Sequence, residues 1–130
     1  MIVRSLMEIQ NTDRDVTGRS GNWTSRRLLL KEDGMGFSLH DTVIRAGTET
    51  PIWYKNHLEA VYCIEGSGEI ELVEKSGIIP IRPGTMYALN NHDRHILRAK
   101  TDLRLVCVFN PALTGREDHD KDGAYPLMEN

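Results

Sequence analysis

Hydrophobic and polar residues alternate through the middle of the chain, as they do in β-strands that bury one face. The pattern is clearest in residues 37–46, where every second side chain would share one side of a strand: Ser38, His40, Thr42 and Ile44. Shorter runs of the same kind lie at 60–64, 69–73, 78–81, 85–89, 95–99 and 103–109. An apolar run at 28–30 indicates one more buried strand within residues 23–31.

Turn-forming residues separate these runs. The segment 65–68 (Glu-Gly-Ser-Gly) indicates a hairpin, and turns are also marked at 32–34, 75–77, 82–84 and 100–102. A weak helical pattern is confined to residues 5–15. About eight or nine short strands at this spacing predict an all-β, single-domain barrel of the jelly-roll type.

Composition narrows the class of protein. With 130 residues, 39% of them hydrophobic, the chain can bury one core and leaves little room for a second. Sixteen basic and nineteen acidic residues give a net charge of −3 without a run of either sign, which argues against nucleic acid or a membrane as partner. No segment has the length of a signal peptide or a membrane span, so we expect a cytoplasmic protein in which Cys63 and Cys107 are buried free thiols.

A metal-site signature lies between residues 47 and 95, with part of its ligand set replaced. Gly47, Glu59 and Gly66 are in register with the cupin pattern of Gly, two histidines, Glu and Gly. The two histidine positions hold Trp53 and Lys55, and neither an indole nor a cationic amine is a usual metal ligand. A second half of the pattern follows the Pro-Gly pair at 83–84 and ends on His95. Glu59 and His95 therefore remain as expected ligands, and a third group must complete the site.

Longer stretches of the chain resemble one cupin family. Residues 53–64 (Trp-Tyr-Lys-Asn-His-Leu-Glu-Ala-Val-Tyr-Cys-Ile), 82–89, 106–111 and 113–117 are similar to the corresponding segments of ectoine synthases. The resemblance covers nearly the whole chain. It implies a small cupin enzyme, commonly a homodimer, that closes N-γ-acetyl-L-2,4-diaminobutyrate into the compatible solute ectoine with loss of water.

The same resemblance supplies the missing ligand, because iron-binding members of the family use a tyrosine that matches Tyr87. Glu59, Tyr87 and His95 would then offer two oxygens and one nitrogen, which suits Fe²⁺, with Zn²⁺ or Mn²⁺ as substitutes. Outside this context, Glu59 would be a solvated carboxylate, His95 a hydrogen-bonded histidine and Tyr87 a packed ring.

The resemblance also points to residues that act on the substrate. Three are candidates for catalysis: Thr42, Tyr54 and Glu117. Five match substrate-contacting positions: Trp23, Arg27, His57, Phe109 and His119. A tyrosine hydroxyl can stabilise an oxyanion, a glutamate can accept the amine proton, and a guanidinium can clamp a carboxylate. Each also has an ordinary role, since threonine favours strands and charged tail residues are usually solvated.

The C-terminal segment, residues 110–130, is rich in Asp, Gly and Pro. We therefore expect a mobile tail that orders as a lid over the barrel mouth when substrate binds. Five of its residues match the EF-hand calcium loop: Asp118, Asp120, Asp122, Gly123 and Glu129. The flanking helices are missing and Pro126 interrupts the loop, so we interpret the match as a polar tail.

Two further expectations concern association and alternative functions. Strand edges are often covered by a second copy, and we expect a homodimer in which Ile2-Val3 and residues 106–108 pair across an edge. The alternatives are a cupin isomerase or dioxygenase acting on another small metabolite, and a ligand-sensing cupin. A dioxygenase generally needs a more nitrogen-rich site, and a sensor needs an output module for which the chain has no spare length.

Overall fold

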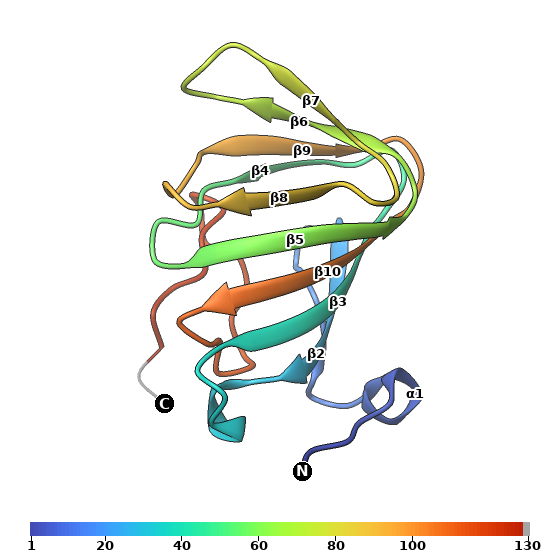
Figure 1. Ribbon diagram of the computed structural model, residues 1–130, viewed down its shortest axis with the longest axis vertical. Helices are drawn as coiled ribbons and strands as arrows, with labels where there is room; N and C mark the ends of the chain where they lie inside the picture. The colour runs from blue at the N-terminus through green and yellow to red at the C-terminus, as the bar shows by residue number, and fades with distance from the viewer. Residues whose placement is uncertain (129–130) are drawn as a thin grey trace.

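The computed structural model describes residues 1–128, which form ten β-strands and two short helical turns (Figure 1). The elements are α1 (Leu6–Ile9), β1 (Asp15–Thr17), β2 (Trp23–Leu29), η1 (Lys31–Asp33), β3 (Ser38–Ile44), β4 (Glu49–Ile52), β5 (Leu58–Glu65), β6 (Gly68–Leu72), β7 (Ile78–Ile81), β8 (Met86–Leu89), β9 (His95–Ala99) and β10 (Leu103–Asn110).

The strands pair into two antiparallel sheets. The larger sheet has the order β1-β2-β3-β10-β5-β8, and the smaller has the order β4-β9-β6-β7. Figure 1 shows the strands stacked from β7 and β6 at the top to β3 and β2 at the bottom. This arrangement confirms the all-β expectation.

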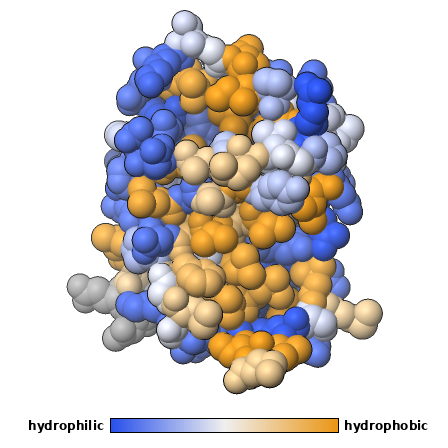
Figure 2. Space-filling view, in the orientation of Figure 1, coloured by the Kyte–Doolittle hydropathy of each residue, from blue (hydrophilic) through white to orange (hydrophobic). Residues whose placement is uncertain are grey.

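The core lies between the inward faces of the two sheets. From the larger sheet it receives Val61 and Leu105, and from the smaller sheet Ile70 and Leu97, all nearly inaccessible to solvent. Alternation along each strand leaves the other face outside. Figure 2 shows apolar residues spread over the face turned toward the viewer, and the outer side chains of β5 and β8 include the exposed Leu58, Tyr62 and Met86.

Several details differ from the sequence-based expectations. Strand β10 lies between β3 and β5 and pairs with both, so residues 106–108 are central and cannot pair across an edge. Residues 2–3 are not in a strand. The helical segment is only α1, which Ser5 begins with a capping box to Glu8. Strands β1 and β4 were not predicted, because both are short and polar.

The C-terminal segment packs against the barrel. Leu113, Ala124 and Tyr125 are buried, and the Trp53 N–H donates to the Gly123 carbonyl oxygen at 3.0 Å. Gly123 has φ +73°, and an added Cβ would lie 2.3 Å from the Pro51 carbonyl oxygen. The tail therefore docks closely beside the end of β4, and its mobility without substrate remains a prediction.

Two sequence-level expectations can be compared directly with this fold. Cys63 and Cys107 are buried free thiols. Within residues 1–128, no helix is long and apolar enough to cross a membrane.

Candidate metal and substrate site

Two of the expected metal ligands come from neighbouring strands of the larger sheet. Glu59 on β5 lies opposite Leu89 of β8, and Tyr87 on β8 lies opposite Val61 of β5. Since residues two apart share a face, Glu59 and Tyr87 are diagonal neighbours. Both line one cavity inside the barrel.

The third expected ligand, His95, comes from β9 of the smaller sheet. Its side chain is buried, and its ring lies 6.3 Å from the Tyr87 ring, centroid to centroid. The Nδ1–H group donates to the Asp93 carbonyl oxygen at 2.9 Å, which leaves Nε2 with a free lone pair. Nε2 is buried and has no hydrogen-bond partner. The hydrogen bond at Nδ1 orients the buried imidazole, and its Nε2 has no partner within the protein. Both features are typical of a histidine that binds a metal.

The electrostatics of these groups also suit a cation. Burial raises the pKa of the Glu59 carboxyl group to about 8 and raises the pKa of Tyr87 well above its usual value. Burial lowers the pKa of His95, so its ring is neutral at pH 7. A nearby cation would favour the charged forms of both oxygen ligands. Among residues 1–128, no three His, Cys, Asp or Glu side chains gather as a metal site.

The residues at the two replaced histidine positions are used elsewhere. Lys55 Nζ forms an ion pair with the Asp122 carboxylate at 2.6 Å. The Trp53 ring has Lys55 Nζ 5.0 Å and the Arg94 guanidinium 5.3 Å from its centroid. Lys55 therefore links this segment to the tail, and Trp53 packs against the cationic side chains of Lys55 and Arg94.

The inner cavity brings together most of the candidate residues. It has a volume of about 30 Å³, and its walls include Trp23, His40, Thr42, Tyr54, Glu59, Tyr87, Cys107, Phe109, His119 and Tyr125. The Tyr54 hydroxyl and His119 Nε2 share a hydrogen bond of 2.8 Å. Burial lowers the pKa of His119 to about 4, so this ring is neutral at pH 7.

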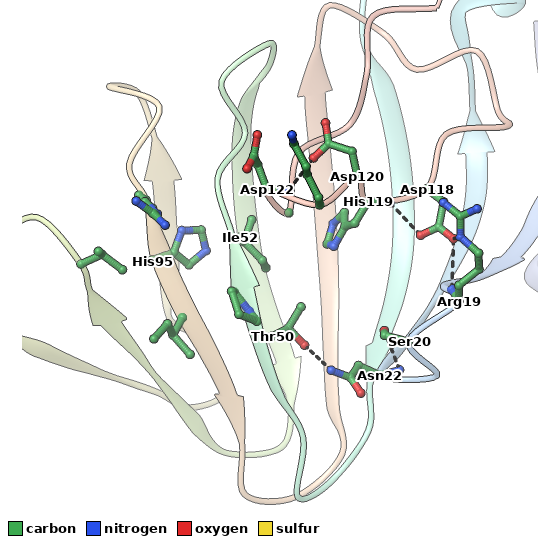
Figure 3. Close-up of a pocket in the computed structure, with 16 residues that line it drawn as sticks. Arg19, Ser20, Asn22, Thr50, Ile52, His95, Asp118, His119, Asp120 and Asp122 are labelled. Atoms are coloured by element: carbon green, nitrogen blue, oxygen red, sulfur yellow. Dashed lines mark hydrogen bonds and ion pairs between the residues drawn. The ribbon is translucent and has the colours of Figure 1, made fainter.

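A larger outer cavity, of about 480 Å³, lies next to the inner one and shares Thr50, Ile52 and His119 with it. Figure 3 shows His95 and His119 on either side of this outer cavity, with Ile52 and Thr50 between them. The outer cavity therefore joins the proposed metal ligand on β9 to the tail.

Two expected substrate-contacting residues, Arg27 and His57, do not line the inner cavity. Arg27 is fully buried; its Nη2 donates to the Glu117 carbonyl oxygen at 2.8 Å and its Nε to Ser25 Oγ at 3.2 Å. Arg27 Nη1 has no partner, and neither has Nδ1 of the buried His57. Unpaired buried polar atoms are costly, and they fit groups that a ligand completes.

Glu117 is placed apart from the inner cavity. Its carboxylate accepts hydrogen bonds from the Thr114 N–H, the Thr114 hydroxyl and the Gly115 N–H at 2.8, 3.0 and 2.9 Å. Although burial opposes ionisation, the hydrogen bonds lower the pKa of Glu117. It lines a separate cavity of about 250 Å³ together with His57. The carboxylate thus closes a local turn beside His57.

Several residues that line the inner cavity were not among the predicted site residues, and they include His40, Cys107 and Tyr125. His40 shares its strand face with Thr42, and that alternation was the available signal. Its ring nitrogens are hydrogen-bonded to Ser25 Oγ at 2.9 Å and Ser38 Oγ at 3.1 Å. No comparable signal marked Tyr125, because it lies in an irregular segment.

The acidic residues of the tail are engaged within the protein. Asp120 accepts the N–H groups of Asp122 and Ala124, and Asp118 accepts the Arg19 N–H. Asp122 is paired with Lys55, and Glu129 lies outside the described residues. These contacts agree with the interpretation of a polar tail.

Comparison with known proteins gives a consistent result. The family model for ectoine synthase matches residues 1–129. An L-ectoine synthase from Desulfatibacillum aliphaticivorans is 71% identical over 129 residues, which cover 99% of each chain. The crystal structure of an ectoine synthase from P. lautus has a TM-score of 0.88 at 60% identity and covers 100% of this chain and 92% of its own. A cupin barrel protein from Salinispora arenicola is only 17% identical, with a TM-score of 0.66 over 84% of this chain and 87% of its own, and supports the cupin fold.

Proposed function

This chain belongs to the ectoine synthase family, and we propose that it carries out the reaction of that family in the inner cavity beside Glu59 and Tyr87. The enzyme is a hydro-lyase that forms ectoine from N-γ-acetyl-L-2,4-diaminobutyrate. The α-amine attacks the amide carbonyl within the same molecule, and water is lost. The observation that carries this conclusion is the family match over residues 1–129.

We assign the metal to Glu59, Tyr87 and His95, with Fe²⁺ as the favoured ion and Zn²⁺ or Mn²⁺ as substitutes. The bare, buried Nε2 of His95 supports this set, together with the placement of Glu59 and Tyr87 on one inward face. When bound, a divalent cation supplies Lewis-acid polarisation of the amide carbonyl, which is otherwise a poor electrophile.

The protein's own residues bind and orient the substrate. Arg27 Nη1 is a buried donor without an acceptor, which suits the substrate carboxylate. The aromatic walls formed by Trp23, Phe109 and His119 exclude water and favour a bent conformation that brings amine and carbonyl together. The unpaired Nδ1 of His57 offers a further polar contact.

Proton transfer is assigned to Tyr54, Thr42 and Glu117. Burial raises the pKa of Tyr54 well above its usual value, so its hydroxyl stays protonated and can donate a hydrogen bond to the developing oxyanion. The Thr42 hydroxyl lines the same cavity and can relay a proton to the departing oxygen. Because Glu117 lies beside His57 and not beside Glu59, we propose that the amine proton reaches Glu117 through His57.

The tail acts as a lid in this proposal. The inner cavity of about 30 Å³ has space for roughly a water molecule, and the substrate is far larger. His119 and Tyr125 form part of its wall, and both belong to the tail. Outward movement of the tail would admit substrate, and its return would exclude the water that opposes dehydration.

We further propose a cytoplasmic homodimer. The edges of the larger sheet are β1 and β8, and the outer face of β8 and β5 carries the exposed Met86, Tyr62 and Leu58. An exposed apolar face next to a sheet edge suits a second copy of the chain. Light scattering at micromolar concentration should give twice the chain mass, and a monomer mass contradicts this part of the proposal.

The ligand assignment is tested by separate Ala variants of Glu59, Tyr87 and His95. Each should lose bound iron and ectoine formation together, because three ligands leave no redundancy. Ile78→Ala is the control, since this residue is exposed on β7 and lies outside both the candidate site and the face proposed to bind a second copy. Normal metal content in any of the three variants would remove that residue from the ligand set.

A further inference from the structure

Tyr125 holds a central place among the residues proposed to act on the substrate. Its ring is buried and stacks on the Tyr54 ring, with centroids 5.1 Å apart and planes 17° apart. It also contacts the rings of Phe109 at 5.4 Å and His119 at 4.8 Å. A parallel stack limits rotation of both rings, so Tyr125 limits the directions in which the Tyr54 hydroxyl can point.

The backbone around Tyr125 is fixed by its own contacts. Asp120 and Ala124 close a turn through an N–H to carbonyl hydrogen bond of 2.8 Å, and Gly123 is held by the Trp53 N–H. The Asn56 side chain donates to the Tyr125 carbonyl oxygen at 3.0 Å. These hydrogen bonds fix the loop that places the Tyr125 ring against the Tyr54 ring.

The Tyr54 hydroxyl is flanked by two side chains of the tail. It shares the 2.8 Å hydrogen bond with His119 Nε2. Tyr125 is also among the groups that raise the pKa of Tyr54. Docking of the tail thus sets both the plane of the Tyr54 ring and the surroundings of its hydroxyl.

Tyr125 also contacts the residue proposed to hold the substrate carboxylate. The Arg27 guanidinium carbon lies 5.6 Å from the centroid of the Tyr125 ring. One tail side chain therefore lies against the proposed oxyanion donor, Tyr54, and against the proposed carboxylate clamp, Arg27. We infer that Tyr125 is a positioning residue for the cyclisation and acts through Tyr54, an inference that rests on the proposed role of Tyr54.

The test is a double-mutant cycle between Tyr54→Phe and two variants of Tyr125. In the wild-type background, Tyr125→Leu should lower kcat by about tenfold, as expected for loss of an aromatic pair. Tyr125→Phe keeps the stack and should lower kcat by about threefold. Both losses should nearly vanish in the Tyr54→Phe background, because the residue through which they act has already lost its hydroxyl.

Metal content and Tm are measured in every variant, and Ile78→Ala, at an exposed position of β7, is the control. If either Tyr125 variant lowers kcat by the same factor in both backgrounds, Tyr125 does not act through Tyr54. If Tyr54→Phe itself retains the wild-type kcat, the proposed role of Tyr54 fails and the inference fails with it. The Phe variant preserves the packed ring, so the cycle gives an answer even if Tyr125→Leu does not fold.

Discussion

Gly123→Ala tests whether the docked tail is needed for turnover. In the native structure, the Gly123 carbonyl accepts the Trp53 N–H at 3.0 Å, and the Gly123 N–H donates to the Asp120 carbonyl oxygen at 3.0 Å. A Cβ at this position would lie 2.3 Å from the Pro51 carbonyl oxygen and 2.9 Å from Ile52 Cα. Both are backbone atoms, so the tail must shift away from β4.

The size of the effect follows from the contacts that the shift breaks. Two hydrogen bonds join the tail to residues 53–56: the Trp53 N–H donates to the Gly123 carbonyl oxygen, and the Asn56 side chain donates to the Tyr125 carbonyl oxygen. At about 1 kcal/mol each, their loss should weaken docking of the tail by about 2 kcal/mol. That corresponds to a decrease of up to about 30-fold in the docked population. We expect kcat for ectoine formation to fall by a similar factor in a chromatographic assay, with metal content unchanged.

Gly34→Ala provides the matched control. Gly34 has φ +74°, nearly the same as Gly123, but an added Cβ there meets no atom within 4 Å. Both variants share the strain of a left-handed residue, about 1–2 kcal/mol, and only Gly123→Ala displaces the tail. If the two variants have the same kcat, close docking of the tail at Pro51 does not contribute to catalysis.

Three other predictions follow from ionic and polar contacts. Glu117→Gln should lower kcat and also lower the free energy of unfolding by about 1–3 kcal/mol, because the amide N–H group of the new side chain would face a backbone donor of the 114–117 turn. An unchanged urea denaturation curve would show that the turn does not depend on the carboxylate. The hydrogen bond from Arg4 depresses the folded-state pKa of Asp33, so the stability it contributes is present above its unfolded pKa and is lost as pH falls through the folded value. Asp33→Asn should therefore lower Tm more at pH 7 than at pH 2, and an equal loss at both pH values would contradict this linkage. Asp122→Asn breaks a partly exposed ion pair with Lys55, so any fall in kcat should be less than about fivefold and should disappear in 1 M salt; a loss that persists in salt would show another role for Asp122.

Much of the barrel could be predicted from the sequence. Strands β5 to β10 follow alternating runs separated by Gly, Pro and Asp, and the turn chemistry fixes their approximate ends. Pairing order is not contained in that pattern, which is why residues 106–108 were placed at an edge although β10 lies between β3 and β5. The family prediction was confirmed because long, specific segments carried it.

The candidate site was harder to predict where it depends on irregular backbone. Thr42, Tyr54, Glu59 and Tyr87 lie on or next to strands, and all four line the inner cavity. Tyr125 belongs to a segment whose composition suggested mobility, but its ring is buried by contacts with residues far away in sequence. The composition of a segment indicates how much apolar area it can bury by itself. It does not indicate the surface of the folded protein against which the segment packs.

Titration of metal-free protein with Fe²⁺ under anaerobic conditions tests the central claim most directly, with ectoine measured by chromatography after each addition. If Glu59, Tyr87 and His95 hold a required metal, ectoine formation should start near zero and rise to a plateau at about one Fe²⁺ per chain. Full ectoine formation by the rigorously metal-free protein would contradict the proposed centre.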